Sequence, residues 1–261
     1  MSNERQQRAA RAEKMRKERE KAEKRQRNLI TVGIVVVVIA LVAAGAYAIA
    51  TTSSENATQD EVVAPKGATK DYGIPYTSED AGGEAAPDAV KVVIYEDFQC
   101  PVCQAFEQAN GAFLDAAVKA GDIEIEYRLL TFLDRASPNQ YSSRAGSAAL
   151  CAFESGGGEA YKKVAAMLWA TQPPEGSEGP ENPALIDTLG QAGVKGATVE
   201  TCVTKEQFVP WLGEATEASR DADVSGTPTV RIDGKDVTGP NGEGVPQIPE
   251  LQKAIEAAKK A

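Results

Sequence analysis

The sequence predicts an α/β domain that carries an inserted helical region and follows a single membrane-spanning helix. Three observations support this fold class: an apolar, β-branched run leads into a Cys-x-x-Cys pair and a helical pattern, a mainly helical stretch follows, and two short strand patterns and a last helix end the chain. We expect a basic arm at 1–28, the membrane helix at 29–50, a tether at 51–88, and the folded domain at 89–261, with its helical insertion at about 136–222.

The charges are unevenly distributed along the 261 residues. The first 50 residues hold 11 Lys or Arg and 5 Glu, and the remainder holds 17 basic and 33 acidic side chains. The acidic excess after residue 50 argues against nucleic acid as a partner, because acidic side chains repel phosphate groups. The chain has no histidine, which excludes Ser-His-Asp, Cys-His and His-metal chemistry.

Neither a metal nor an organic cofactor is expected. A closed zinc site requires four ligands, and the chain has one Cys-x-x-Cys pair and no histidine to complete such a set. The Gly/Pro-rich segment at 239–249 lacks the spacing of a phosphate-binding loop, so we interpret it as a connector. What remains for the Cys-x-x-Cys pair is the role of a redox dithiol.

Residues 29–50 are 22 residues without a charge. As a helix they would extend about 33 Å, which is enough to cross a bilayer core. Basic residues precede this segment and polar, acidic residues follow it, which predicts a cytoplasmic amino terminus and an extracytoplasmic body. A cleaved signal peptide is the alternative, since Ala46-Tyr47-Ala48 has the form of a cleavage site, but the lengths favour a retained anchor. Either outcome delivers the body to an oxidising compartment.

Residues 51–88 are rich in small and polar side chains, and we interpret them as a tether. A short strand is expected near 72–76, where the fold begins. The next strand is predicted at 89–95, which is rich in β-branched and aromatic residues.

The Cys-x-x-Cys pair follows that strand directly, and apolar residues then recur at helical spacing. Cys100 is therefore placed at the amino end of a helix, where free N–H groups and the helix dipole stabilise a thiolate and lower its pKa. Pro101 suits the first helical position. Cys103 lies one turn further on, close enough to resolve a mixed disulfide formed by Cys100.

The segment after the redox helix predicts a strand at 122–130 and then a helical region. Its helices are expected at 139–155, 159–171, 183–192 and 208–221, separated in part by the glycines at 156–158 and by the Pro/Gly/Glu-rich loop at 172–182. Once Cys100 and Cys103 pair, the remaining two cysteines allow a single pairing, so we predict a structural disulfide between Cys151 and Cys202.

The last part of the chain predicts a loop, a strand, an Asp-Gly turn, another strand and an amphipathic helix at 248–261. Pro228 opens the first of these strands, where its missing N–H matters least. The Thr227-Pro228 bond is a candidate for the cis form.

These motifs in this order resemble the DsbA branch of the thioredoxin superfamily. The resemblance covers roughly residues 88–261, and it implies a thioredoxin fold with an inserted helical domain. An anchored form with a second disulfide is similar to the thiol oxidases of Gram-positive bacteria. The resemblance to the DsbA branch rests on a helical insert and on two motifs: Asp97-Phe98-x-Cys100-Pro101-x-Cys103 and Gly226-Thr227-Pro228-Thr229.

The resemblance also implies roles for individual residues. Cys100 is expected to be the exposed nucleophile and Cys103 the shielded partner. A cis-proline turn at Thr227 and Pro228 is expected to lie against the redox pair and to let the Thr227 backbone bind an extended substrate.

The sequence departs from the family pattern in two places. Many relatives carry an acidic proton relay six positions before the first cysteine, where this chain has Ile94, so Glu96 or Asp97 is expected to substitute. The dipeptide Pro101-Val102 also lacks the histidine of the most oxidising members. We therefore expect an intermediate reduction potential, on the order of −200 to −130 mV.

The leading functional hypothesis is an extracytoplasmic thiol:disulfide oxidoreductase that introduces disulfides into unfolded exported proteins. The resemblance implies reoxidation by a membrane quinone-linked partner of the DsbB or VKOR type. One alternative is the reverse direction, a thiol reductase or isomerase. The other is an anchored thioredoxin-like binding module without catalysis.

Overall fold

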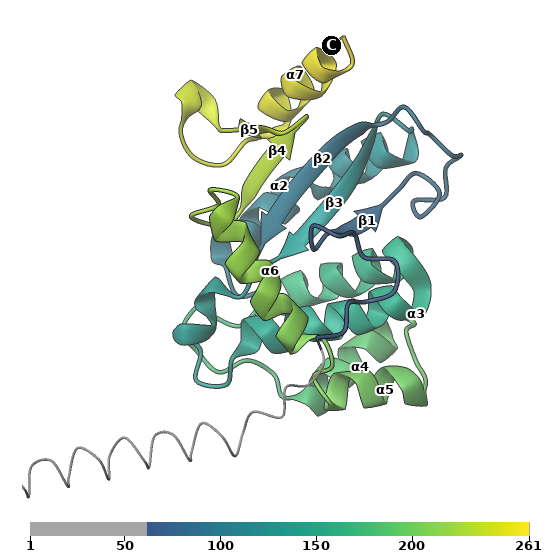
Figure 1. The fold of residues 1–261 in the computed structure, drawn as a ribbon, viewed down its shortest axis with the longest axis vertical. Coiled ribbons are helices and arrows are strands. Elements are labelled where there is room, and N and C mark those ends of the chain that lie inside the picture. Colours follow the sequence, from purple (N-terminus) through teal and green to yellow (C-terminus); the bar gives the residue numbers. More distant parts are fainter. Residues whose placement is uncertain (1–61, 261) are drawn as a thin grey trace, which may run out of the picture. The chain divides into compact units, whose positions relative to one another are not determined.

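The computed structural model describes residues 62–260. The expected basic arm, the membrane helix at 29–50 and the first part of the tether, 51–61, lie outside the described residues. Within residues 62–260, no helix is both long enough and apolar enough to cross a membrane. The elements follow one another along the chain as β1 (Ile74–Tyr76), β2 (Val90–Glu96), α2 (Pro101–Lys119), β3 (Ile123–Leu129), η1 (Phe132–Arg135), α3 (Tyr141–Ala170), α4 (Asn182–Gln191), α5 (Ala197–Thr204), α6 (Val209–Asp221), β4 (Thr229–Ile232), β5 (Lys235–Val237), η2 (Pro240–Gly242) and α7 (Ile248–Ala258) (Figure 1).

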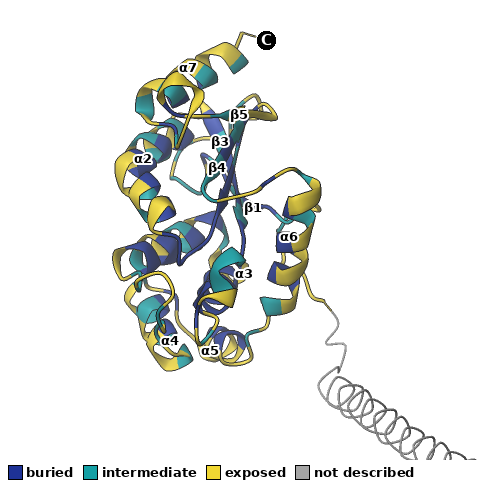
Figure 2. Ribbon diagram, turned by 90° about the vertical axis from the view of Figure 1, so that its left-hand side faces the viewer, coloured by how far each residue is buried: buried dark blue, intermediate teal, exposed yellow. Residues whose placement is uncertain are grey.

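The strands form one sheet in the order β1-β3-β2-β4-β5. β2 and β3 run parallel, and the other pairs are antiparallel. β2 occupies the centre because its β-branched residues are buried between two neighbours: Ile94 pairs with Tyr127 on one side and with Val230 on the other. Helices α2 and α7 cover one face of the sheet, and α6 lies on the other (Figure 2). The central strand β2 therefore leads directly into the junction that carries the cysteines.

The fold begins with β1, which confirms the short strand expected near 72–76 and extends the folded domain into the segment interpreted as a tether. Ile74 is fully buried, and β1 pairs with β3 along the edge of the sheet. The ring of Tyr72 lies 5.3 Å from that of Trp211 on α6, measured between centroids. Burial of apolar side chains and the added strand hold this part of the expected tether on the domain.

The helical insertion forms as predicted in its main helices, with two differences. The predicted helices at 139–155 and 159–171 are joined end to end in α3, which is broken where Gly157 adopts a φ of 68°. A side chain at that φ would be strained, so glycine is required at the break. Helix α5, with η1 before α3, was not predicted as helix.

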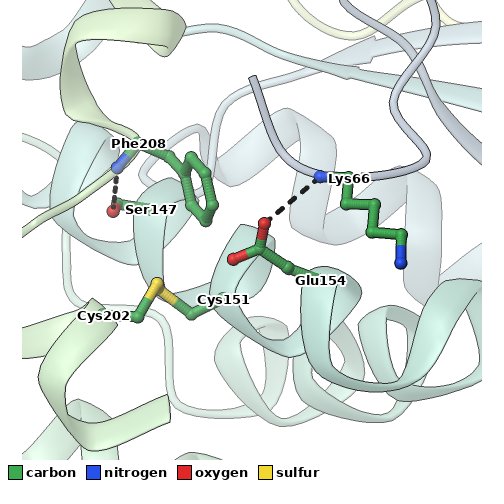
Figure 3. Close-up of a disulfide and its surroundings, with 6 residues drawn as sticks. All are labelled: Lys66, Ser147, Cys151, Glu154, Cys202 and Phe208. Carbon is green, nitrogen blue, oxygen red and sulfur yellow. Dashed lines mark hydrogen bonds between the residues drawn. A yellow bond between two sulfur atoms is a disulfide. The ribbon is translucent and has the colours of Figure 1, made fainter. Parts of the chain in front are cut away.

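A disulfide joins Cys151 of α3 to Cys202 of α5, with an S–S distance of 1.99 Å and a Cα–Cα distance of 5.9 Å (Figure 3). One turn before Cys151, Ser147 Oγ accepts a hydrogen bond of 3.2 Å from the Phe208 N–H. On the other side, the Lys66 N–H donates to Glu154 Oε1 over 3.3 Å. The disulfide therefore sits in the part of α3 that other segments also hold in place.

Candidate active site

The two cysteines of the Cys-x-x-Cys motif lie where β2 leads into α2. Cys100 is the N-cap residue, with φ −80° and ψ 116°, and Pro101 opens the helix. Cys103 is fully buried, and Cys100 retains 7% exposure, so Cys100 is more enclosed than expected of the exposed nucleophile that the resemblance implied. Between them, Val102 is 48% exposed and forms the apolar surface beside the sulfurs.

The proline motif, 127 residues further along the chain, lies against Cys100. The Thr227-Pro228 bond is cis, and the Cys100 Sγ lies 3.4 Å from the Thr227 carbonyl oxygen. The sulfur opens onto a groove of about 680 Å³, which the 3-10 helix η1 and the loop before β4 border.

The two thiols have opposite pKa shifts. The pKa of Cys100 is lowered to about 6, and the largest cause is a hydrogen bond with the Cys103 thiol. Hydrogen bonds with Thr227 and with the N–H groups of Val102 and Cys103 lower this pKa further, whereas burial raises it. The sequence analysis had explained this lowered pKa by the free N–H groups and the dipole at the helix end alone. Burial raises the pKa of Cys103 well above its ordinary value, and its hydrogen bond to Cys100 and the charge of Glu96 raise it further. At neutral pH, Cys100 is a thiolate and Cys103 a protonated thiol.

Glu96, the last residue of β2, is fully buried beside the cysteines. Burial raises its pKa well above the ordinary value; the charge of Glu107 adds to the shift, and the charge of Lys162 opposes it. The charge of Cys100 also acts on this carboxyl. Ile94, at the relay position of the family pattern, is instead a fully buried apolar residue in the centre of the sheet.

Lys162 of α3 brings a positive charge to this carboxyl group from the helical insertion. Its Nζ lies 3.4 Å from Glu107 Oε2 and 3.3 Å from Asp115 Oδ1, and it donates a hydrogen bond of 2.9 Å to the Tyr127 hydroxyl. Burial lowers the pKa of Lys162, but the charges of Glu107, Asp115 and Glu96 outweigh it, so that the pKa lies above its ordinary range. The sequence analysis did not single out this lysine.

Asp97 has a different task from Glu96. Its carboxylate accepts hydrogen bonds from the Gln99 N–H at 2.9 Å, the Leu133 N–H at 3.0 Å and the Ser142 hydroxyl at 2.5 Å. Burial raises its pKa to about 6, although these three donors lower it. Asp97 therefore ties the redox loop to η1 and to the start of α3.

No three His, Cys, Asp or Glu side chains in residues 62–260 are grouped as a metal ion would require. Both redox cysteines are free thiols in this structure. The site residues available for chemistry are therefore the two sulfurs, the buried carboxyl of Glu96 and the Thr227 backbone.

Comparison with known proteins agrees with this geometry. The family model described as thioredoxin matches residues 77–257. The chain belongs to the thioredoxin family. Both sequence motifs of the site, the cysteine pair and the Thr227-Pro228 turn, lie inside the matched range.

Solved structures show that this thioredoxin-family chain is DsbA-like. A disulfide bond oxidoreductase of Mycobacterium tuberculosis, DsbG in its reduced form, is 26% identical with a TM-score of 0.58, over 77% of this chain and 97% of that one. Oxidised DsbA of the same organism is 26% identical with a TM-score of 0.58, over 72% and 98%. MdbA, a thiol-disulfide oxidoreductase from Corynebacterium diphtheriae, is 25% identical with a TM-score of 0.57, over 77% and 97%.

One curated relative is a longer protein, of which this chain matches one part. The serine/threonine-protein kinase PknE of Mycobacterium tuberculosis is 28% identical over 156 residues, which cover 57% of this thioredoxin-family chain and 27% of the kinase. The chain thus matches a minor part of that protein's length.

Proposed function

We propose that this protein is an extracytoplasmic thiol:disulfide oxidase, which introduces disulfides into exported proteins through Cys100-Pro101-Val102-Cys103. The observation that carries the proposal is the pair of opposite pKa shifts beside the cis-proline turn. A nucleophile whose pKa is lowered to about 6 is a good leaving group at neutral pH, because the thiolate that departs is stable.

The reaction begins with Cys100 and Cys103 joined as a disulfide. A substrate thiolate attacks Cys100 Sγ, a mixed disulfide forms, and the bonding electron pair of the broken bond leaves with the Cys103 sulfur, which takes up a proton. The second substrate thiol loses its proton to solvent and attacks the substrate sulfur of the mixed disulfide. Cys100 then leaves as a thiolate. The substrate has lost two electrons, and the redox pair has gained them.

Glu96 is the residue we assign to donate the proton to Cys103. Burial raises its pKa, which favours the protonated form that can donate, and the charge that the carboxyl carries once it has given up the proton raises the pKa of Cys103. Glu107 and Lys162 also line a cavity of about 730 Å³ between α2 and α3, which does not include the cysteines. A proton can thus be replaced from a side of the domain other than the substrate groove.

Thr227 and Pro228 are assigned to substrate binding. The carbonyl beside Cys100 Sγ is an acceptor that the backbone N–H of an extended substrate can use. Pro101 and Val102 complete the redox pair, and the exposed Val102 side chain offers apolar contact to an unfolded polypeptide.

The direct test follows the gain of disulfide in a reduced, unfolded secreted protein mixed with the oxidised full-length chain. The wild type is expected to transfer one disulfide per redox pair. Cys103→Ser, which cannot form the pair, is the control and is expected to transfer none. A measured potential near the value of about −270 mV for thioredoxin would contradict the oxidase direction.

Thiol trapping in living cells separates the oxidase from the reductase or isomerase. An oxidase is expected to be found mainly disulfide-bonded, and a reductase mainly as thiols. If Cys100→Ala leaves the cellular role intact, the binding module without catalysis is the better explanation.

We further propose a single-pass anchor at 29–50, with the domain outside the cytoplasm. The uncharged segment and the basic residues before it support this orientation. A quinone-linked membrane protein of the DsbB or VKOR type is then the expected reoxidase. Protease added to intact cells should digest the domain; resistance in cells together with digestion in lysates would contradict this location.

A further inference from the structure

The segment that follows α3 is hydrogen-bonded to the backbone of the redox loop. Gln172 Nε2 donates to the Phe98 carbonyl over 2.9 Å and to the Cys100 carbonyl over 3.0 Å. Both hydrogens of one amide group are therefore donated to carbonyls of the redox loop just before the start of α2. Gln172 lies in the predicted helical insertion, just after the end of α3, and its side chain connects the insertion to the Cys100 backbone.

Two further glutamines make the same connection in the reverse direction. Gln99 Nε2 donates to the Ser177 carbonyl over 2.9 Å, and Gln104 Nε2 donates to the Trp169 carbonyl over 2.6 Å. The Phe98 ring packs on the Trp169 ring, with 4.6 Å between centroids. The Pro/Gly/Glu-rich loop is thus fixed to the redox loop at several points, and Gln172 is the contact that reaches the nucleophile itself.

The Cys100 carbonyl matters because Cys100 is the N-cap of α2 and has no side-chain capping bond. This carbonyl accepts the first helical hydrogen bond, from the Gln104 N–H at 3.2 Å, as well as the bond from Gln172. Fixing its direction fixes the peptide groups of the first turn, whose N–H groups point toward the sulfur. The amide donor also counters the partial negative charge that the carbonyl oxygen places near Sγ. Both effects favour the thiolate over the thiol.

We propose that Gln172 is a positioning residue for the redox centre: through it, the helical insertion holds the Cys100 carbonyl and stabilises the Cys100 thiolate. The inference rests on the proposed function in taking Cys100 as the nucleophile. The inference adds that Gln172, about 70 positions beyond the cysteine motif, contributes to the reduction potential of the pair.

The test compares Gln172→Met with the wild type in the full-length reduced chain. Methionine keeps the length of the side chain and removes both donors. The pH dependence of Cys100 alkylation by iodoacetamide gives the apparent pKa of the thiol, and Gln172→Met is expected to raise it by about 0.5 to 1 unit, as expected for one or two lost hydrogen bonds. The equilibrium with glutathione should shift about 3- to 10-fold away from the reduced pair, which is about 15 to 30 mV toward a less oxidising potential.

Gln191→Met is the matched control, because Gln191 is an exposed glutamine at the end of α4 in the same insertion. It is expected to leave both quantities unchanged. Gln172→Asn, whose amide is one methylene too short for the two carbonyls, is the second variant and carries the same expectation as Gln172→Met.

A wild-type pKa and equilibrium in the folded Gln172 variants would overturn the proposal. Loss of the near-UV circular dichroism signal in both variants would also overturn it, in favour of a purely structural role. The alkylation profile needs no protein substrate, so it tests Gln172 even if the chain proves not to transfer disulfides. A shifted profile with no transfer by the wild type would count against the oxidase assignment alone.

Discussion

Replacing Glu96 with Gln tests whether a buried carboxyl is held protonated beside the redox pair. The folded-state pKa of Glu96 is raised above its value in the unfolded chain, about 4.3, because burial outweighs the attraction of Lys162. Over the pH range between these two values, the folded state binds a proton that the unfolded state has lost. The free energy of unfolding of the parent therefore decreases as the pH rises through this range, by at most about 1.4 kcal/mol per pH unit for one proton.

Glu96→Gln cannot titrate, so it lacks this decrease. The stability of the variant relative to the parent should increase with pH from about pH 4.3 upward, and it should level off at the folded-state pKa of Glu96. A constant offset from the amide, which has to find its own hydrogen bonds, does not affect this slope. We expect the effect because Lys162 is shared with Glu107 and Asp115, and so cannot compensate Glu96 alone.

The assay is urea unfolding between pH 4 and pH 8, in a background with Ala at Cys100 and Cys103. Neither redox thiol then titrates, and the structural disulfide is kept because no reductant is needed. Glu256→Gln, at an exposed position on α7, is the control and should show no such trend. A difference that stays constant with pH, or that decreases as pH rises, would refute the reasoning, since the latter is the signature of a carboxylate stabilised by an ion pair.

Three further perturbations follow from the same contacts. The rate of alkylation of Cys100 should be half-maximal at about pH 6, and a midpoint near the ordinary cysteine value would contradict a thiolate stabilised by hydrogen bonds. Removing the disulfide by Cys151→Ser with Cys202→Ser should lower the free energy of unfolding by about 4 kcal/mol for a loop of this length, measured by urea unfolding of the pair against the wild type. Gly158→Ala should lower the free energy of unfolding by about 1 to 3 kcal/mol. The added Cβ would lie 2.7 Å from Asp80 Cγ and 2.8 Å from the Pro75 carbonyl oxygen. Gly213→Ala, a helical glycine with open space around it, should instead stabilise the protein, and equal effects at the two glycines would count against the packing argument.

Sequence patterns located the strands and the redox helix because the signals there are local. The β-branched run of β2 and the periodic apolar residues of α2 each suffice to indicate their own structure. Helix α5 had no such signal: Val199, Thr201 and Val203 are β-branched and favour helix weakly. Its helical form depends on tertiary contacts, which include the disulfide at Cys202 and the burial of Val199.

The participants that the sequence did not reveal are those whose role depends on burial. Lys162 lies among charged and small residues in a helix, which is the usual setting of a solvated side chain. In the fold its Nζ lies over the Tyr127 ring, 5.0 Å from the centroid, and among carboxylates. Gln172 stands in a loop whose composition suggested only a separator. Neither Lys162 nor Gln172 forms a spacing motif with the cysteines, so no sequence pattern connects either residue to the redox pair.

Both of these side chains come from the helical insertion, and this changes what the insertion does for the redox centre. The sheet, α2 and the proline turn supply the sulfurs and the acceptor at Thr227. The insertion supplies the charge that acts on Glu96 and the amide that holds the Cys100 carbonyl. Stabilising the Cys100 thiolate favours the reduced pair, and in the proposed mechanism Cys103 takes its proton from Glu96. The insertion therefore acts on Cys100 through Gln172 and on Cys103 through Lys162 and Glu96. We therefore expect the potential to depend on the contacts made by the insertion as well as on the dipeptide between the cysteines.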